Sequence, residues 1–238
     1  MNARTGSIKA PQASRGLPAG QRLLIAATAA TVLVAFVPGA QLLLYPLRLF
    51  VTLVHEGGHA VMTLLTGGAV RAIAIDPSGS GVTYSVGGVP FVVLMAGYLG
   101  TLAVGALSLQ IGRRPGAGRG ALLLMGVVAG LVTLLWVRNP FGFAVGLGAA
   151  GTLLAAARVL RGPAADFACS FLAVQLCLNA VLDLRGLLWL TTQTHAANDA
   201  VFMSQLYGMP PWFWAGMWAA TGMLVLAAAL RSYWRGCR

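Results

Sequence analysis

Seven long apolar stretches, separated by short polar or glycine-rich segments, dominate the chain. They cover residues 23–37, 41–66, 89–111, 121–137, 143–160, 167–190 and 212–233. A helix needs about 20 mostly apolar residues to cross the hydrocarbon core of a bilayer. The chain is 58% hydrophobic and only 9% charged, whereas soluble domains carry about 25% charged residues. The sequence therefore predicts an all-α, multi-pass membrane protein with about seven transmembrane helices.

The first residues differ from the rest of the chain. Residues 1–21 are polar and contain basic residues, glycine, proline and alanine without an apolar period. Such a composition is typical of segments that cannot bury enough apolar surface to fold. We therefore expect a disordered basic tail at residues 1–21 and a single membrane domain at residues 22–238.

The formal net charge of +11 comes from basic residues spread over the chain ends and loops. This distribution is typical of arginines that flank membrane spans, and it argues against nucleic-acid binding, which needs a clustered basic face. If seven spans crossed the membrane, seven Lys and Arg residues would lie on one side and eight on the other. The positive-inside rule requires an imbalance, so the sequence leaves the orientation open.

Residues 69–88 interrupt the apolar pattern. Residues 70–75 alternate weakly, residues 76–81 read Asp-Pro-Ser-Gly-Ser-Gly, and residues 82–86 are rich in strand-forming side chains. Two short strands around a turn of this composition predict a β-hairpin. The hairpin is either a plain connection or an edge that pairs with an extended segment of a substrate.

An HExxH motif lies near the middle of the second apolar stretch, at His55, Glu56 and His59. On a helix, two histidines four residues apart leave the same face, one turn from each other. This spacing allows both imidazoles to bind one zinc ion, with the glutamate between them placed to accept a proton from water. Glu56 is the only glutamate in the chain, and a carboxylate within an apolar stretch needs a partner or a function.

A catalytic zinc usually has three protein ligands and an open position, so a third ligand must come from elsewhere. We prefer Asp183, because it lies well within an apolar stretch where a charge is costly. Asn179 lies one helical turn before it and is expected to support the ligand through a hydrogen bond. The alternative is that the two residues form a packing stripe, or that Asp183 pairs with Arg185.

Four other residues complete the candidates for the third ligand. Asp199 is the second choice, although it can equally be the N-cap of a short amphipathic helix that follows it. His195 is the third choice. Asp76 precedes a proline within the predicted turn, where aspartate is common for backbone reasons, and Asp166 is interpreted as the N-cap of the sixth apolar helix.

With these motifs, the chain resembles the site-2 protease family of intramembrane zinc metallopeptidases, and within it the compact bacterial peptidase-like branch. The resemblance rests on the HExxH motif, the glycine-rich hairpin, the sequence Ala-Gly-Tyr-Leu-Gly at 96–100, and segments 179–183 and 198–200. It implies one catalytic zinc bound by His55, His59 and an aspartate, with Glu56 as the general base.

The resemblance also implies a function. We expect a zinc endopeptidase that cleaves peptide bonds within or near the transmembrane segments of membrane proteins, in the lipid bilayer of a bacterial cell membrane. Two alternatives remain open at the level of sequence. One is a catalytically inactive membrane protein that keeps the zinc site, and the other is a transporter of metal ions or small molecules, whose path buried histidines and aspartates would line.

Overall fold

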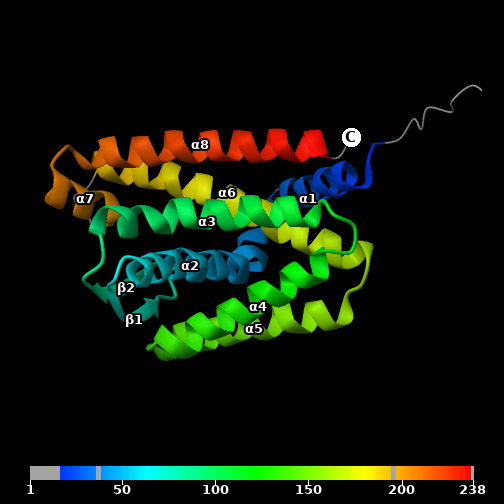
Figure 1. The fold of residues 1–238 in the computed structure, drawn as a ribbon, viewed down its shortest axis with the longest axis horizontal. Coiled ribbons are helices and arrows are strands. Elements are labelled where there is room, and N and C mark those ends of the chain that lie inside the picture. The colour runs from blue at the N-terminus through cyan, green and yellow to red at the C-terminus, as the bar shows by residue number, and fades with distance from the viewer. Residues whose placement is uncertain (1–16, 36–38, 194–196, 237–238) are drawn as a thin grey trace, which may run out of the picture.

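The computed structural model describes residues 17–35, 39–193 and 197–236, so most of the tail expected at residues 1–21 lies outside the described residues. The described residues form eight α-helices and one two-stranded sheet (Figure 1). In chain order the elements are α1 (Ala19–Ala35), α2 (Ala40–Leu65), β1 (Ala69–Ile75), β2 (Gly81–Val86), α3 (Pro90–Gly112), α4 (Gly118–Trp136), α5 (Pro140–Val159), α6 (Pro163–Gln193), α7 (Asp199–Tyr207) and α8 (Pro211–Gly236). The predicted helical class and the predicted hairpin are both confirmed.

Each of the seven apolar stretches forms a helix, but seven membrane spans are not confirmed. Five helices are long and apolar enough to cross a bilayer, namely α3, α4, α5, α6 and α8. α1 has 17 residues, which falls short of the usual length of a span. α2 has 26 residues, but Arg48 and the polar residues of the HExxH motif interrupt its apolar sequence, and it is not among these five helices. The chain is an integral multi-pass membrane protein with a small sheet at one end.

The two ends of the helix bundle carry different elements (Figure 1). The hairpin end holds β1, β2 and α7, together with the connection between α4 and α5. At the opposite end, the start of α1 meets the end of α8, where the hydroxyl of Tyr233 donates to the carbonyl of Gly20 at 2.6 Å. Seven crossings would have placed these two segments on opposite sides of a membrane. α2 and α6 both end at the hairpin end, so they run in the same direction.

The hairpin lies along α2 instead of projecting away from the bundle. β1 and β2 are antiparallel, with Ala74 opposite Val82. Near the turn, the hydroxyl of Tyr45 donates to the carbonyl of Pro77 at 2.6 Å and that of Thr52 donates to the carbonyl of Gly79 at 2.7 Å. These contacts hold the turn against the first half of α2.

The connection between α4 and α5 pairs with β1 and fixes the inner side of the hairpin. The side chain of Asn139 accepts a hydrogen bond from the backbone N–H of Ile75 at 3.1 Å and donates to its carbonyl at 2.7 Å. Ile73 and Ile75 are fully buried beneath this contact. β2 has no such neighbour among the described elements, and its apolar side chains Val82, Tyr84 and Val86 are exposed.

Asp166 differs from its predicted role as the N-cap of its own helix. α6 begins three residues earlier, at Pro163, and the carboxylate of Asp166 reaches another helix. Its two oxygens accept hydrogen bonds from the backbone N–H groups of Gly116, at 2.8 Å, and Gly118, at 2.9 Å. These groups lie at the start of α4, whose own N-cap is Ala117 and offers no side-chain acceptor. Asp166 therefore caps α4 from α6 and ties the two helices together.

Candidate metal centre

His55 and His59 leave the same face of α2, as their spacing predicts. Their Nε2 atoms lie 3.1 Å apart. The Nδ1 atom of His59 lies 2.7 Å from the carbonyl oxygen of Val93, in the first turn of α3. Because a carbonyl can only accept, Nδ1 carries the proton and Nε2 keeps its lone pair for a ligand. The backbone of α3 thus orients one of the two histidines for metal binding.

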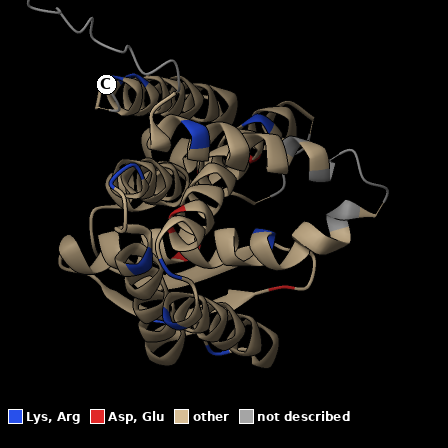
Figure 2. Cartoon of the chain, turned by 90° about the vertical axis from the view of Figure 1, so that its right-hand side faces the viewer, with Lys and Arg blue, Asp and Glu red and all other residues tan. Residues whose placement is uncertain are grey.

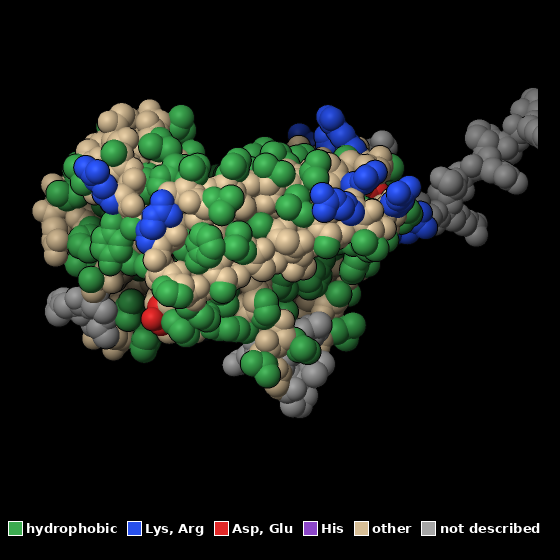
Figure 3. Space-filling view, turned by 90° about the horizontal axis from the view of Figure 1, so that it is seen from below, with side chains coloured by type: hydrophobic (Ala, Val, Ile, Leu, Met, Phe, Trp, Pro, Cys, Tyr) green, Lys and Arg blue, Asp and Glu red, His purple; other side chains and the backbone are tan. Residues whose placement is uncertain are grey.

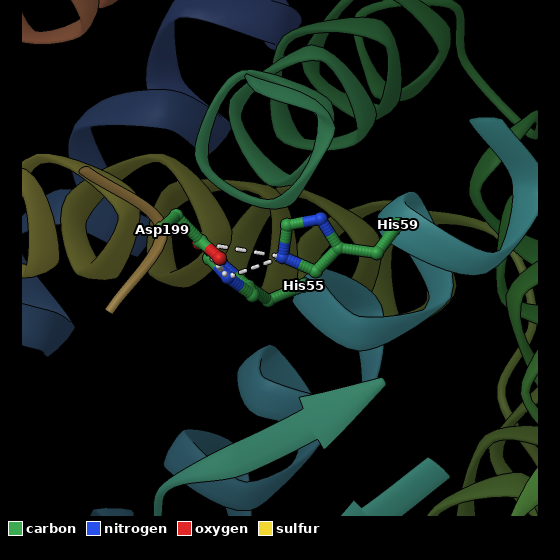
Figure 4. A group of neighbouring side chains, drawn as sticks. All are labelled: His55, His59 and Asp199. Atoms are coloured by element: carbon green, nitrogen blue, oxygen red, sulfur yellow. Dashed lines mark hydrogen bonds and ion pairs between the residues drawn. The ribbon is translucent and has the colours of Figure 1, made fainter. Parts of the chain in front are cut away.

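Asp199 completes a group of three ligand atoms with these histidines (Figure 4). Its Oδ2 atom lies 3.4 Å from Nε2 of His55 and 3.4 Å from Nε2 of His59. Asp199 is the first residue of α7, but it does not cap that helix. The side chain of Asn198 accepts the hydrogen bond from the backbone N–H of Val201 at 3.0 Å. Asn198 takes the N-cap role, which leaves the carboxylate of Asp199 free to face the histidines.

The three ligand atoms have nearly the spacing of a tetrahedral metal site. They form a triangle with sides of 3.1, 3.4 and 3.4 Å. Zinc binds nitrogen and oxygen ligands at about 2.0–2.2 Å, so two ligands of a tetrahedral site lie about 3.3–3.6 Å apart. The two edges to Asp199 match this spacing, and the edge between His55 and His59 is slightly shorter. Two imidazoles and one carboxylate also form a donor set that is typical of catalytic zinc sites, which leave one position open. The residues present therefore fit a metal ion of this kind.

α3 covers the histidine pair so closely that only glycine fits at the contact. A Cβ atom on Gly97 would overlap Nε2 of His55 and Nε2 of His59. On α2, a Cβ atom on Gly58, the residue before His59, would overlap the carbonyl oxygen of Ala96. Gly58, within the HExxH motif, and Gly97 thus allow α2 and α3 to approach at the site, which explains why both sequences are rich in small residues.

An aromatic stack lies beside His55. The ring of Tyr98 meets the imidazole of His55 edge-on, with centroids 4.5 Å apart, and stacks on Trp218 of α8 with centroids 5.8 Å apart. Trp218 is fully buried. The packing of α8 against α3 therefore restricts the ring of His55 from the side opposite the hairpin.

Glu56 is enclosed by the hairpin and is only 4% exposed. The hydroxyl of Thr83 in β2 lies 2.6 Å from Oε2 of Glu56 and 3.1 Å from its carbonyl oxygen. A Cβ atom on Gly81 would come within 2.7 Å of both Cγ and Oε1 of Glu56. The hairpin therefore orients the carboxylate by a charge-assisted hydrogen bond and leaves no room for a side chain at position 81.

The remaining sequence candidates do not join the group. Asp183, the preferred third ligand, has an exposed side chain on α6 and lies outside the cluster of ligand atoms. The amide of Asn179, which was expected to support that ligand, donates back to the carbonyl of Gln175 within α6 at 2.8 Å. His195 lies outside the described residues. Among the aspartates, the second choice, Asp199, is the one that the fold brings to the histidines.

Asp76 occupies the predicted turn. The backbone N–H of Ser78 donates to its carboxylate at 2.8 Å, and this hydrogen bond holds the pKa of Asp76 below its ordinary value because it stabilises the charged form. Asp76 thus has the backbone role that its position before proline suggests, and it lies outside the cluster of ligand atoms.

The sequence pattern gave no separate signal for three residues that shape the site. Thr83, Val93 and Gly97 come from β2 and α3, and each acts on the motif across more than 25 residues of chain. Gly97 belongs to the segment 96–100 that carries the family resemblance, but nothing in the sequence placed it against the histidines. Val93 acts through its backbone, so no side-chain pattern could have found it.

Comparison with known proteins agrees with this geometry. A family model described as Peptidase M50B-like matches residues 24–229. The match confirms the resemblance to the site-2 protease family and includes the whole candidate centre. No curated protein and no solved structure matches the chain significantly.

Proposed function

The chain belongs to the Peptidase M50B-like family, and from that premise we propose that it is an intramembrane zinc endopeptidase that cleaves peptide bonds within or near transmembrane segments. The observation that carries this proposal is the triangle formed by Nε2 of His55, Nε2 of His59 and Oδ2 of Asp199, whose edge lengths are close to those of a tetrahedral site. Glu56, between the two histidines in the sequence, supplies the carboxylate that such hydrolysis requires.

In the proposed reaction, His55, His59 and Asp199 hold the zinc ion. Zinc at such a site supplies Lewis acidity, which polarises a carbonyl group and makes water more acidic. Glu56 takes a proton from the attacking water, and the oxygen of that water bonds to the scissile carbonyl carbon. When the C–N bond breaks, Glu56 returns that proton to the leaving nitrogen. Thr83 holds the carboxylate in position throughout, and the carbonyl of Val93 holds His59.

The surroundings of the centre support a substrate that lies in the membrane. The motif belongs to a helix packed against α3, and the helices around it are long and apolar. Peptide bonds in a helix are protected by its backbone hydrogen bonds, so the helical segment must unwind before one of its peptide bonds is hydrolysed. The exposed side of β2 next to Glu56 offers an unpaired strand edge, to which an extended substrate segment can add as a further strand. We propose that this edge receives the unwound segment of the substrate.

The experiment that tests the proposal compares the wild-type protein with the Glu56→Gln variant. Both are purified in detergent, their bound zinc is measured, and each is incubated with model transmembrane peptides. We expect about one zinc ion per chain in both proteins, and cleavage only by the wild type. The matched control is Asp76→Asn, which makes the same carboxylate-to-amide change in the exposed hairpin turn, outside the cluster of ligand atoms; it should bind zinc and cleave the peptides like the wild type.

The two alternative functions predict different results in the same assay. An inactive zinc-binding protein would hold zinc but cleave none of a broad panel of transmembrane peptides. A transporter would carry ions across the membrane of liposomes, and its flux would depend on the histidines. A wild-type protein that takes up no zinc on reconstitution contradicts the proposed function.

A further inference from the structure

The arginines of this protein gather at one end of the bundle. Eight of the described arginines lie at or near helix ends on the side opposite the hairpin, namely Arg22, Arg113, Arg114, Arg119, Arg158, Arg161, Arg231 and Arg235. Seven of them are exposed, and Arg113 is half-buried. Figure 2 looks onto this end, where the basic residues surround the helix ends. We call this surface the arginine end.

Hydrogen bonds between distant segments show that these arginines share one end. The guanidinium of Arg113 donates to the carbonyl of Ser232 at 3.2 Å, and that of Arg119 donates to the carbonyl of Ala157 at 2.8 Å. The start of α1 is tied to the end of α8 by Tyr233, and the start of α4 is tied to α6 by Asp166. The ends of α3, α5 and α8 and the starts of α1, α4 and α6 therefore form one face.

The hairpin end carries far less positive charge. Of the other described arginines, Arg71 and Arg138 lie there, the guanidinium of Arg48 lies beside Gly79 of the hairpin turn, and Arg185 lies in the hairpin half of α6. Figure 3 shows the basic side chains gathered at the two ends, mostly at the arginine end, with hydrophobic side chains between them. The balance that follows from counting seven spans in the sequence is thus replaced, among the described residues, by eight arginines against four.

The protein does not neutralise the charge of the arginine end itself. The chain contains five acidic residues, and four of them belong to the metal centre, the hairpin turn or the hairpin half of α6. The fifth, Asp166, lies at the arginine end, but it is 3% exposed and both its oxygens accept hydrogen bonds from backbone N–H groups of the α4 start. Among the described residues no carboxylate pairs with these arginines, so they are available to an anionic partner outside the protein.

Two of the exposed tryptophans lie at the two ends of α8, about the thickness of a bilayer apart. Trp212 is 53% exposed at the start of α8, and Trp234 is 41% exposed near its end. At 1.5 Å per residue, 22 residues of helix separate them by about 33 Å, which is close to the thickness of a bilayer's hydrocarbon core. Tryptophan prefers the membrane interfaces. Trp234 lies between Arg231 and Arg235 in the sequence, so the arginine end reaches the phosphate groups of one leaflet.

We propose that the arginine end binds the anionic lipid phosphates of the cytoplasmic leaflet, which places the metal centre in the half of the protein away from the cytoplasm. Lys and Arg accumulate on the cytoplasmic side of membrane proteins, and the anionic lipids of that leaflet attract them. The metal centre lies near the hairpin end, because His59 contacts the fourth residue of α3 and Asp199 begins α7. The peptide bonds it reaches would then lie near the outer face of the membrane.

The orientation is tested in cells that express the full chain, in a Cys237→Ser background that keeps the buried Cys169 and Cys177. One variant carries Gln205→Cys, on the exposed side of α7, and the other carries Pro115→Cys, exposed between α3 and α4. A membrane-impermeant maleimide should label the first variant in intact cells and the second only after permeabilisation. Labelling of both after denaturation is the control for equal reactivity.

The opposite pattern overturns the proposal, as does labelling of the Pro115→Cys variant in intact cells. Lipid binding has its own readout, which is the amount of anionic phospholipid retained by the purified protein. The double variant Arg114→Gln and Arg161→Gln should retain less than half of the wild-type amount, whereas Arg71→Gln should retain it unchanged. Equal retention in all three proteins would show that the arginine end does not bind lipid phosphates. None of these measurements depends on peptidase activity.

Discussion

The hydroxyl of Thr83 donates a hydrogen bond of 2.6 Å to Oε2 of Glu56, from the middle of β2 to the metal-binding helix. The two residues are 27 positions apart in the chain. The contact exists because the turn of the hairpin is held against the first half of α2 by Tyr45 and Thr52. The hairpin is therefore part of the proposed catalytic apparatus as well as a connection between two helices.

Replacing Thr83 by valine should slow peptide cleavage by about tenfold, because a positioned carboxylate loses the hydrogen bond that orients it. Thr83→Ser keeps the hydroxyl and should restore most of the rate. The measurement is kcat on a transmembrane peptide, with bound zinc determined in parallel. If Thr83→Val and Thr83→Ser cleave equally fast, the hydrogen bond has no role in catalysis.

The third ligand can be identified by comparing two aspartates. Asp199→Ala removes an oxygen that lies 3.4 Å from both histidines, so the purified variant should lose most of its zinc. Asp183→Ala, which changes an exposed side chain of α6, should retain about one zinc ion per chain. Metal analysis after dialysis measures both. Loss of zinc from the Asp183 variant alone would restore the preference that the sequence suggested.

Gly97→Ala should abolish zinc binding, because the added methyl group would occupy the space of the two Nε2 atoms of the proposed metal site. Gly100→Ala is the matched control, since its Cβ atom would meet nothing closer than Cα of Gly58 at 3.8 Å. Both variants lie on α3 and gain helix propensity. Circular dichroism verifies that each is folded before its zinc content is measured. Full zinc content in the Gly97 variant would contradict the observed packing.

Asp166→Asn should lower the free energy of unfolding by about 2 kcal/mol, because an amide can accept only one of the two backbone hydrogen bonds at the start of α4. The readout is the thermal unfolding midpoint in detergent. Asp76→Asn, in the exposed hairpin turn, is the control and should change the midpoint little. Zinc content should be unaffected in both variants. An unchanged midpoint for Asp166→Asn would show that the two hydrogen bonds contribute little.

The sequence alone determined those features that depend on neighbours in the chain. The helical class, the hairpin and the placement of His55, Glu56 and His59 on one helix all follow from periodicity and spacing within single elements. The family resemblance followed from the same short motifs. None of these inferences needed to know which helices lie side by side.

The tertiary structure decided which distant residue meets the histidines and where the charges lie. Asp183 was preferred because an aspartate in an apolar stretch is costly, but that cost does not say which residue is close to the motif. Asp199 looked like a helix cap until the fold assigned that role to Asn198. The arginines looked balanced because the count assumed seven crossings. The contact of Tyr233 with Gly20 instead brings the start of α1 and the end of α8 to the same end of the bundle. Ligand geometry and charge asymmetry depend on distances between elements, which spacing along a single sequence does not contain.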